Sequence, residues 1–595
     1  MKLYNLSKIA TGLILSGTLL ASCNDFLDQP AKDSYNGETF YTTDEAAYQG
    51  VNPLYNMPWS DFSRSFFKVG EVMSGNYYMK GGDDTQYWNC NLSSNNPDLK
   101  SMSYSLWSVN GYANIIYNNI KNSTGPSQQV KNTCMGECLT WKAMAYFYLV
   151  RTFGAVPIIH DNNQMIGDGN YNDQYKARIE DVYAYIIKTL ENAIELLPEK
   201  DGTGKGRIDK YCAEALLAKV YLTKSGFDPN TTTYESGSNP YIKTTAHQRN
   251  AEDLAMAAKY AKDVIDNSGR QLEPVYSDIF RGAYHGDESL LAWHWHASRQ
   301  PWTQQNFMQS DLAITGFDET GNTWGGYAGP SVDLQDAFGE DAMKKERNNT
   351  DVRRQATMMM AGDKYDYFYT DEGGFDFLKF IYKGYPNHQG PGQFQSGTGA
   401  NCVKQLIGDN ADHNKYVGGS FDVMAYGNYT QLLRLADVYL IYTEAMIGNN
   451  ESTTDASAID AFYKVRHRAI RTYERPTSVS WEDVWKERRL ELACEGDRWY
   501  DYVRLFYYNP DRAINELHNQ RRDVYWGLDN VYKNWYNNGG YDGAWDTSGA
   551  QYNNKPEFAN PQTSSFTIPF PTEDATQNPH LLEAPVHVDI TQYNY

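Results

Sequence analysis

The side chains best suited to do chemistry in this sequence lie in a glycine-rich stretch, residues 297–331. They are Arg299, Trp302, Trp324 and Tyr327. Trp324 and Tyr327 flank two glycines, a local sequence that is difficult to explain as part of a core. Flat ring faces suit the apolar CH faces of a sugar, while charged and amide groups bind its hydroxyls. We therefore expect these four side chains to contact a hydroxyl-rich ligand such as a carbohydrate.

A second stretch of similar composition, residues 74–96, lies nearer the N-terminus. Its candidate binding residues are Tyr77, Tyr78, Asp84, Trp88 and Asn89. A Gly-Gly pair within it gives the backbone the freedom of a loop. We expect Trp88 to stack on the ligand; the alternative is that Trp88 is half-buried and anchors the loop.

A run of carboxylates near the C-terminus invites a catalytic interpretation. Glu487, Glu491 and Glu495 recur every four residues, on one face of a predicted helix, with Arg488 and Arg498 nearby. Carboxylates can act as general acids and bases. The same spacing lets carboxylates and guanidinium groups form ion pairs that lock helices together. We favour this structural interpretation and predict no catalytic residue.

Metal and cofactor chemistry has little support in the sequence. His294 and His296 share one face of a strand predicted at residues 288–296, but no further ligand stands at a defined spacing. The glycine patterns that bind phosphates or dinucleotides do not occur. We predict no metal ion and no cofactor. One question stays open, because aspartate-rich loops can hold a structural Ca²⁺ even though the chain has no EF-hand loop.

Composition narrows the class of ligand. The chain has 595 residues, a net charge of -21 and 48 tyrosines, one more than its 47 glycines. The negative charge argues against nucleic acid, because phosphate binding needs a basic face. It also favours a neutral ligand over a polyanion. Since aromatic residues make up 14% of the chain, intrinsic disorder does not fit.

The N-terminus has the pattern of a bacterial lipoprotein signal. Two lysines precede an uncharged apolar stretch, residues 9–20. This stretch is too short to span a bilayer and long enough for secretion. Residues 20–23, LASC, resemble a lipobox. We predict that residues 1–22 are removed as a signal peptide, and that lipidated Cys23 anchors the mature chain to a membrane.

The elements that must position the candidate residues are of two kinds. Helical periodicity covers approximately residues 40–270 and 430–510, and predicts a mostly α fold with a scaffold of TPR-like helical pairs. Residues 270–430 are rich in Gly, Asn, Asp, Tyr and Trp. They predict a loop-rich, ligand-binding insertion with short β-strands. Residues 23–595 would then form a single domain.

Residues 481–506, WEDVWKERRLELACEGDRWYDYVRLF, resemble the C-terminal signature of the SusD/RagB family. This family comprises outer-membrane lipoproteins of the starch-utilisation-type systems of Bacteroidetes. Three further stretches are similar to family segments: 434–445 (RLADVYLIYTEA), 465–469 (VRHRA) and 566–571 (FTIPFP). Together with the lipobox, the resemblance runs over nearly the whole chain.

The resemblance implies a non-catalytic, cell-surface protein of the outer membrane. Such a protein captures polysaccharide or oligosaccharide and delivers it to a partner, a SusC-like TonB-dependent outer-membrane transporter. Two alternatives stay open. The cargo could be a peptide, as in the RagB branch of the family, or, less in keeping with the signature, the chain could be a surface glycoside hydrolase or lyase. The resemblance does not determine which glycan is bound.

Overall fold

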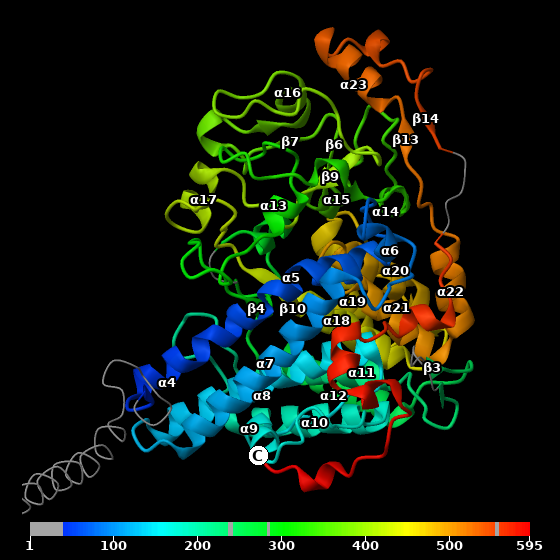
Figure 1. The fold of residues 1–595 in the computed structure, drawn as a ribbon. Coiled ribbons are helices and arrows are strands. Elements are labelled where there is room, and N and C mark those ends of the chain that lie inside the picture. The colour runs from blue at the N-terminus through cyan, green and yellow to red at the C-terminus, as the bar shows by residue number, and fades with distance from the viewer. Residues whose placement is uncertain (1–39, 236–241, 283–285, 554–558) are drawn as a thin grey trace, which may run out of the picture.

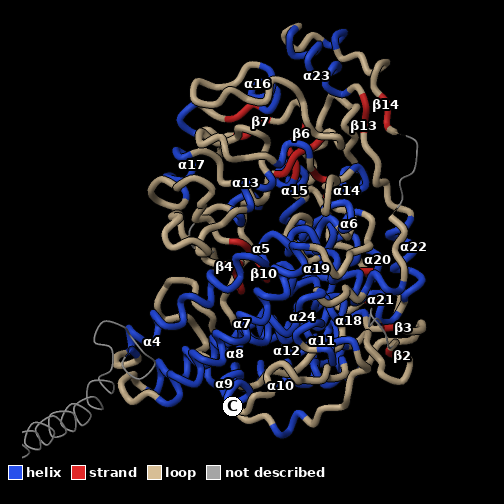
Figure 2. The backbone as a smooth tube through the Cα atoms, viewed as in Figure 1, coloured by secondary structure: helices blue, strands red, loops and turns tan. Residues whose placement is uncertain are grey.

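The computed structural model describes residues 40–235, 242–282, 286–553 and 559–595. The predicted signal peptide, residues 1–22, and Cys23 lie outside these ranges. Within them, no helix is both long enough and apolar enough to cross a membrane. The prediction of a mostly α fold is confirmed, since helices fill one half of the molecule and loops with short strands dominate the other (Figure 2).

Twelve of the described helices form the scaffold or lie directly on it (Figure 1). They are α4 Asp44–Val51, α5 Ser60–Phe67, α7 Pro97–Asn122, α8 Gln128–Phe153, α10 Ile179–Leu196, α11 Lys210–Lys224, α12 Ala251–Asn267, α18 Leu435–Ile447, α19 Ala456–Ala469, α20 Trp481–Leu492, α21 Arg498–Tyr508 and α22 Pro510–His518. Each long helix packs on the next, from α7 to α12, and α12 then packs on α18. The series of helical pairs therefore continues across the insertion.

Helix α10 shows why these segments are helical. Its residues Ile179, Val182, Ile186 and Leu190 are fully buried and recur every three or four positions. This spacing puts them on one stripe that faces the neighbouring helices. Pro198 follows the C-cap residue directly and cannot continue the helix.

Between α12 and α18 the chain forms short elements joined by long loops. They are η4 Tyr276–Phe280, β4 Ser289–Trp293, α13 Met308–Leu312, η5 Gly325–Tyr327, β5 Gly329–Pro330, α14 Val332–Ala337, α15 Val352–Thr357, β6 Met358–Met360, β7 Lys364–Tyr365, η6 Thr370–Glu372, β8 Phe375–Asp376, α16 Phe377–Tyr382, β9 Ala400–Cys402, α17 Asn410–Tyr416 and β10 Thr430–Arg434. Strand β4 pairs antiparallel with β10, so the two ends of this region meet at its base. Trp293 and Trp295 of the predicted strand are buried, as expected for core residues.

The remaining described elements are short. They are η1 Asn52–Tyr55, η2 Met57–Trp59, η3 Lys68–Val72, β1 Tyr77–Tyr78, α6 Asp84–Trp88, α9 Asn162–Gly167, β2 Thr233–Tyr234, β3 Ile242–Lys243, β11 Ser452–Thr453, β12 Val479–Ser480, β13 Tyr525–Trp526, α23 Leu528–Asn537, η7 Asp542–Ala544, β14 Gln551–Tyr552, η8 Thr563–Phe566, α24 Thr572–Gln577, η9 Pro579–Leu582 and η10 Ile590–Gln592. The C-terminal segment, red in Figure 1, returns along the scaffold, where Val586 bridges Ala177.

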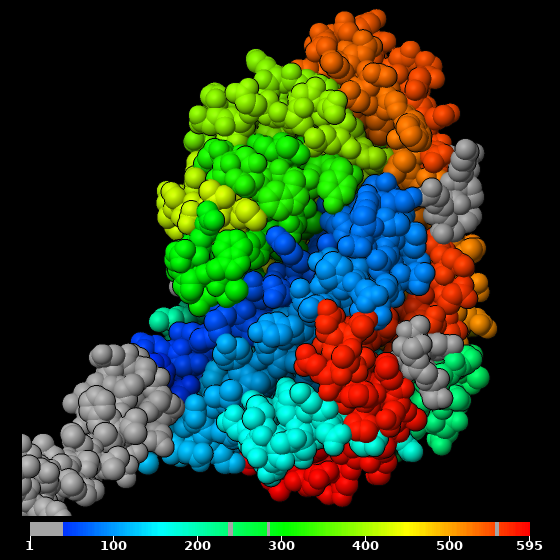
Figure 3. Space-filling model, in the orientation of Figure 1, coloured from blue at the N-terminus to red at the C-terminus, as the bar shows by residue number. Residues whose placement is uncertain are grey.

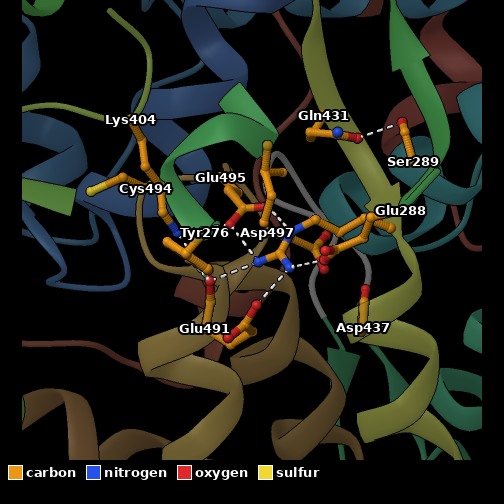
Figure 4. Close-up of polar contacts among 12 residues, drawn as sticks. Tyr276, Glu288, Ser289, Lys404, Gln431, Asp437, Glu491, Cys494, Glu495 and Asp497 are labelled. Atoms are coloured by element: carbon orange, nitrogen blue, oxygen red, sulfur yellow. Dashed lines mark hydrogen bonds and ion pairs between the residues drawn. The ribbon is translucent and has the colours of Figure 1, made fainter. Parts of the chain in front are cut away.

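A buried cluster of ion pairs holds the scaffold and the insertion together at the signature segment (Figure 4). The Glu491 carboxylate binds Arg353 at 2.9 Å and Arg434 at 2.6 Å. A third guanidinium, that of Arg468, completes the set. Burial alone would raise the pKa of Glu491, but the three guanidinium groups hold this pKa well below its usual range. We call this cluster, with the partners described next, the signature network.

The network extends in both directions from Glu491. Arg434 also binds Glu288 at 2.7 Å and Glu495 at 2.8 Å. Glu495 in turn binds Lys404, which comes from the insertion, at 2.8 Å. The structural interpretation of the carboxylate run is thus confirmed. Two details differ. Helix α20 ends at Leu492, so Glu495 lies in the following turn rather than on the helix. The nearby arginines, Arg488 and Arg498, bind Asp437 and Asp501 instead of these carboxylates.

Candidate functional site

Strand pairing joins the two predicted binding stretches into one site. Tyr77 of β1 lies opposite Pro330 of β5, and Tyr78 lies opposite Gly329. The Ser331 N–H donates to the carbonyl of Asn76 at 2.8 Å, which extends this contact by one residue. Residues 74–96 and 297–331 are therefore adjacent, although more than 200 positions separate them. In Figure 3 the green surface of the insertion adjoins the blue surface of the N-terminal segment.

Three aromatic side chains of residues 297–331 are exposed. Trp302 is 48% exposed, Trp324 40% and Tyr327 42%. Trp302 packs against Phe307 with its ring centroid 5.1 Å away, and the Arg299 guanidinium lies 5.8 Å from the Trp302 ring. We call Trp302, Trp324 and Tyr327 the aromatic surface. Exposed rings held in place from behind are the geometry that sugar stacking requires.

Paired charges border the aromatic surface on the side of α5 and α6. The Tyr327 hydroxyl lies 3.5 Å from a carboxylate oxygen of Asp84 and donates to it. Lys68 binds Asp84 and Asp98, each at 2.7 Å. Burial would lower the pKa of Lys68, but the two carboxylates raise it above its ordinary value. Asp84 is thus held by a cation and leaves part of its hydrogen-bonding capacity for a ligand.

Arg64 and Asp311 form the other pair, with 3.1 Å between guanidinium and carboxylate. Asp311 also accepts a hydrogen bond from the side chain of Trp324, which fixes the indole on its polar edge. Burial raises the pKa of Asp311, and Arg64 opposes this shift. The Arg64 guanidinium lies 5.1 Å from the Phe307 ring. One ion pair therefore orients Trp324 and contacts the residue that supports Trp302.

The turn that follows α20 contacts η3, the π-helical turn that begins with Lys68 of this site. Glu71 of η3 accepts hydrogen bonds from the backbone N–H groups of Cys494, at 3.0 Å, and Gly496, at 2.7 Å. A Cβ on Gly70 would come within 2.0 Å of the Gly496 carbonyl oxygen, so the two backbones touch. Lys68, at the start of the same turn, faces the aromatic surface. The signature segment thus positions a residue of the site without belonging to it.

Two residues that the sequence predicted for the site are buried in the structure. Trp88 is 1% exposed and Tyr77 is fully buried. The Trp88 ring meets Tyr78 edge-on at 5.2 Å and lies 4.9 Å from the Arg522 guanidinium, which donates to the Trp88 carbonyl at 2.7 Å. The prediction that Trp88 stacks on a ligand is wrong, because the ring is buried. The alternative, that Trp88 anchors the loop, fits these contacts. Tyr77 is wrong for the same reason, since its ring packs on Phe67 at 4.8 Å.

The other predicted residues remain candidates, and the structure adds new ones. Tyr78 and Asp84 are half-buried, and Asn89 and Arg299 are exposed. Sequence reasoning missed Arg64, Lys68 and Asp311. Arg64 and Lys68 stand four residues apart in an amphipathic stretch that continues from α5 into η3, a signal that could have placed both on one face. Nothing in the sequence around Asp311 marks it.

The charged groups of the signature network and of the aromatic surface are held in ion pairs. Glu487 and Glu491 are fully buried in ion pairs, so no ligand can reach them. Over the four described ranges, no group of three or more His, Cys, Asp and Glu side chains lies close enough together to hold a metal ion. Carboxylates at the surface, Asp84 and Asp311, are already paired with cations. Their arrangement suits hydrogen bonding to hydroxyls.

Two family models match the chain. One, described as the SusD family, covers residues 213–587. The other, described as "Starch-binding associating with outer membrane", covers residues 34–222. The two matches together span almost all the described residues.

Individual relatives agree with these matches. The chain is 32% identical to a SusD-like protein of Bacteroides ovatus, over 98% of this chain and 99% of that one. It is similar to a crystal structure with a xylogluco-oligosaccharide, at 29% identity and a TM-score of 0.74, covering 91% of this chain and 99% of the other. A laminarin-binding SusD-like protein shares the fold at 21% identity and a TM-score of 0.58, covering 80% of this chain and 94% of the other.

Proposed function

Because this chain belongs to the SusD/RagB family, we propose that it captures polysaccharide or oligosaccharide at the bacterial cell surface without cleaving it. The captured glycan passes to a SusC-like, TonB-dependent transporter in the outer membrane. A lipid on Cys23 holds the protein at that membrane, facing outward. In this proposal the protein supplies binding, and other proteins supply transport and cleavage.

The observation that carries the proposal is the aromatic surface with its bordering ion pairs. Trp302, Trp324 and Tyr327 offer three ring faces, and Asp84 and Arg64 offer hydrogen bonds to hydroxyls. Because the nearby charges are paired, the site suits a neutral glycan better than a polyanion. The relative with a xylogluco-oligosaccharide makes xyloglucan the first probe.

Affinity electrophoresis in native gels tests the binding site. The gels would contain xyloglucan, laminarin, starch, xylan or mannan. We expect at least one to retard the wild-type protein, and the double variant Trp302→Ala/Trp324→Ala to migrate as it does without glycan. Tyr541→Ala is the matched control, because Tyr541 is 70% exposed and lies near η7, outside this site. Equal retardation of the double variant and the wild type would remove this site from the proposal.

Peptide capture and catalysis, the two alternative functions, would each give a different result with the same protein preparation. If no glycan retards the protein and mass spectrometry finds peptides bound to it, the peptide-capturing assignment replaces ours. If incubation with the retarding glycan generates new reducing ends, the protein is an enzyme. We expect neither result, since exposed rings favour sugar faces over the main-chain hydrogen bonds that peptide capture uses.

Membrane attachment is tested separately. Cys23→Ala removes the only thiol that a lipobox could lipidate, so we expect the variant to leave the membrane fraction of the producing cell. Full-length protein should also co-purify with the transporter from detergent-solubilised outer membranes. Retention of the Cys23→Ala variant in washed membranes would contradict the lipid anchor and leave the glycan proposal intact.

A further inference from the structure

A groove of about 400 Å³ lies apart from the aromatic surface, between α7, the loop after α9 and α24. Three segments far apart in sequence build it. Helix α24 is held there because Thr572 donates its N–H to the Ser94 carbonyl at 3.0 Å, and the Asn578 side-chain amide donates to the Gln174 carbonyl at 2.9 Å. In Figure 3 the blue, cyan and red surfaces of these segments meet. The volume is in the range of small-molecule sites.

Aromatic rings dominate one wall of this groove. Tyr104 and Trp107 stand three residues apart on α7, so their side chains share a face. Tyr104 is 69% exposed, and Trp107 is half-buried with its edge toward Tyr146, 6.1 Å between ring centroids. Tyr171 adds a third, half-buried ring from the loop after α9. A single exposed tyrosine would be unremarkable, but three rings lining one groove are not scattered surface residues.

Polar groups from α7, α24 and the loop after α9 line the rest of the groove. Lys100 binds Glu573 at 2.8 Å, and the Ser103 hydroxyl donates to Asp574. Asn172 and Gln577 contribute exposed amides. Amides both donate and accept hydrogen bonds, as the hydroxyls of a sugar do. The lining thus combines ring faces with amides and charged groups, which is the chemistry of the aromatic surface built from different residues.

We propose that this groove is a second glycan-binding site, which takes a short stretch of the same class of neutral glycan. The inference rests on the proposed function for the identity of its ligand. Helix α7 connects the two sites: Asp98, which binds Lys68 beside the aromatic surface, precedes Tyr104 by six residues, or about 9 Å along the helix axis. Two sites on one chain increase retention of a long polymer more than of an oligosaccharide, because the second contact becomes intramolecular.

Titration of the full-length chain with two probes tests the groove. The probes are xyloglucan polymer and a xylogluco-oligosaccharide, or the corresponding pair for whichever glycan retards the wild type most. Tyr104→Ala removes the most exposed ring of the groove, which is 69% exposed and lies outside the buried core. We expect this variant to bind polymer about fivefold more weakly than the wild type. In the Trp302→Ala/Trp324→Ala background, weak residual binding should remain and should vanish when Tyr104→Ala is added. Tyr541→Ala again serves as the control.

The outcomes separate the two proposals. If the double variant loses all binding and Tyr104→Ala binds both probes as tightly as the wild type, the groove proposal is overturned and the aromatic surface stands. If Trp302→Ala/Trp324→Ala binds normally and Tyr104→Ala does not, the groove is the principal site and the first assignment fails. If the wild-type protein binds none of the glycans, both are overturned.

Discussion

The signature network and the aromatic surface use charged side chains under opposite conditions. Arg434 is 1% exposed in the network and contacts three carboxylates. The Arg64 side chain is 43% exposed beside the aromatic surface and contacts one. In the first region charge specifies how scaffold and insertion fit together; in the second it orients rings and stays accessible to a ligand. The difference teaches that the same residue types can fix the packing of the fold where they are buried and can stay available to a ligand where they are partly exposed.

The same contrast holds for tryptophan. Trp88 ends α6 and Trp324 precedes η5, and a Gly-Gly pair lies near each of them in the sequence, yet Trp88 is buried and Trp324 is 40% exposed. Arg522 covers Trp88, whereas Trp324 contacts Asp311 and stays partly exposed. Changes at these positions should therefore affect different properties.

The largest effect is expected from Glu491→Gln. This substitution keeps the shape of the side chain and removes the charge that three guanidinium groups share. Breaking a buried pair by removing one partner costs about 3–5 kcal/mol. Urea unfolding would measure the loss. Asp460→Asn is the control, since its pair with Arg475 is 56% and 43% exposed and should cost less than about 1 kcal/mol. Equal losses of unfolding free energy in the two variants would show that the buried ion pairs stabilise the fold no more than an exposed pair does.

Trp88→Ala should also destabilise the chain strongly. Removing a large buried aromatic side chain costs about 3–5 kcal/mol, because a cavity is left behind. Differential scanning calorimetry, compared with Trp88→Phe, would show a graded loss. If Trp88→Ala were as stable as the wild type and lost glycan binding, Trp88 would be a ligand-stacking residue and not a core residue.

A third prediction concerns pH and Asp437. Burial would raise the pKa of Asp437, but Arg488 at 2.6 Å and Lys219 at 2.7 Å lower it to about 2 from an ordinary 3.8. A folded-state pKa below the unfolded value stabilises the protein above about pH 4, and this stabilisation is lost as the pH falls through about 2. The contribution is about 2 kcal/mol.

Asp437→Asn tests this sign directly. The variant resembles the protonated carboxyl group, so its unfolding free energy should lie below that of the wild type at pH 5, and the gap should narrow toward pH 2. Urea titrations at several pH values would measure the gap. A gap that stays constant would show that Asp437 is not held ionised by its two cations.

The smallest effect on stability is expected from Trp324→Ala. The side chain is partly exposed, so the unfolding free energy should change by no more than about 0.5 kcal/mol. Glycan binding should nevertheless weaken about tenfold, as for a central aromatic contact. Calorimetric titration beside a thermal melt would measure both quantities on one sample. A large loss of stability with unchanged affinity would place Trp324 with Trp88.

Much of the scaffold could be predicted from the sequence because its signals are local. The stripe from Ile179 to Leu190 repeats every three or four residues, and Pro198 sets its end. The carboxylates at positions 487, 491 and 495 were predictable as members of ion pairs, but their partners were not. Glu491 pairs with Arg353, Arg434 and Arg468, which lie far from it or on another helix. The exposed rings of the insertion could also be proposed, since the glycines around Trp324 and Tyr327 are visible in the sequence.

What the sequence by itself determined is thus the family, the helical scaffold and the two stretches that could bind a ligand. Only the tertiary structure decided that β1 and β5 join these stretches, that Arg522 buries Trp88, and that Asp311 orients Trp324. It also decided that α24 and Tyr104 line the same groove. Each of these contacts joins residues that are far apart along the chain, and no local propensity or spacing reports which distant partner covers a side chain.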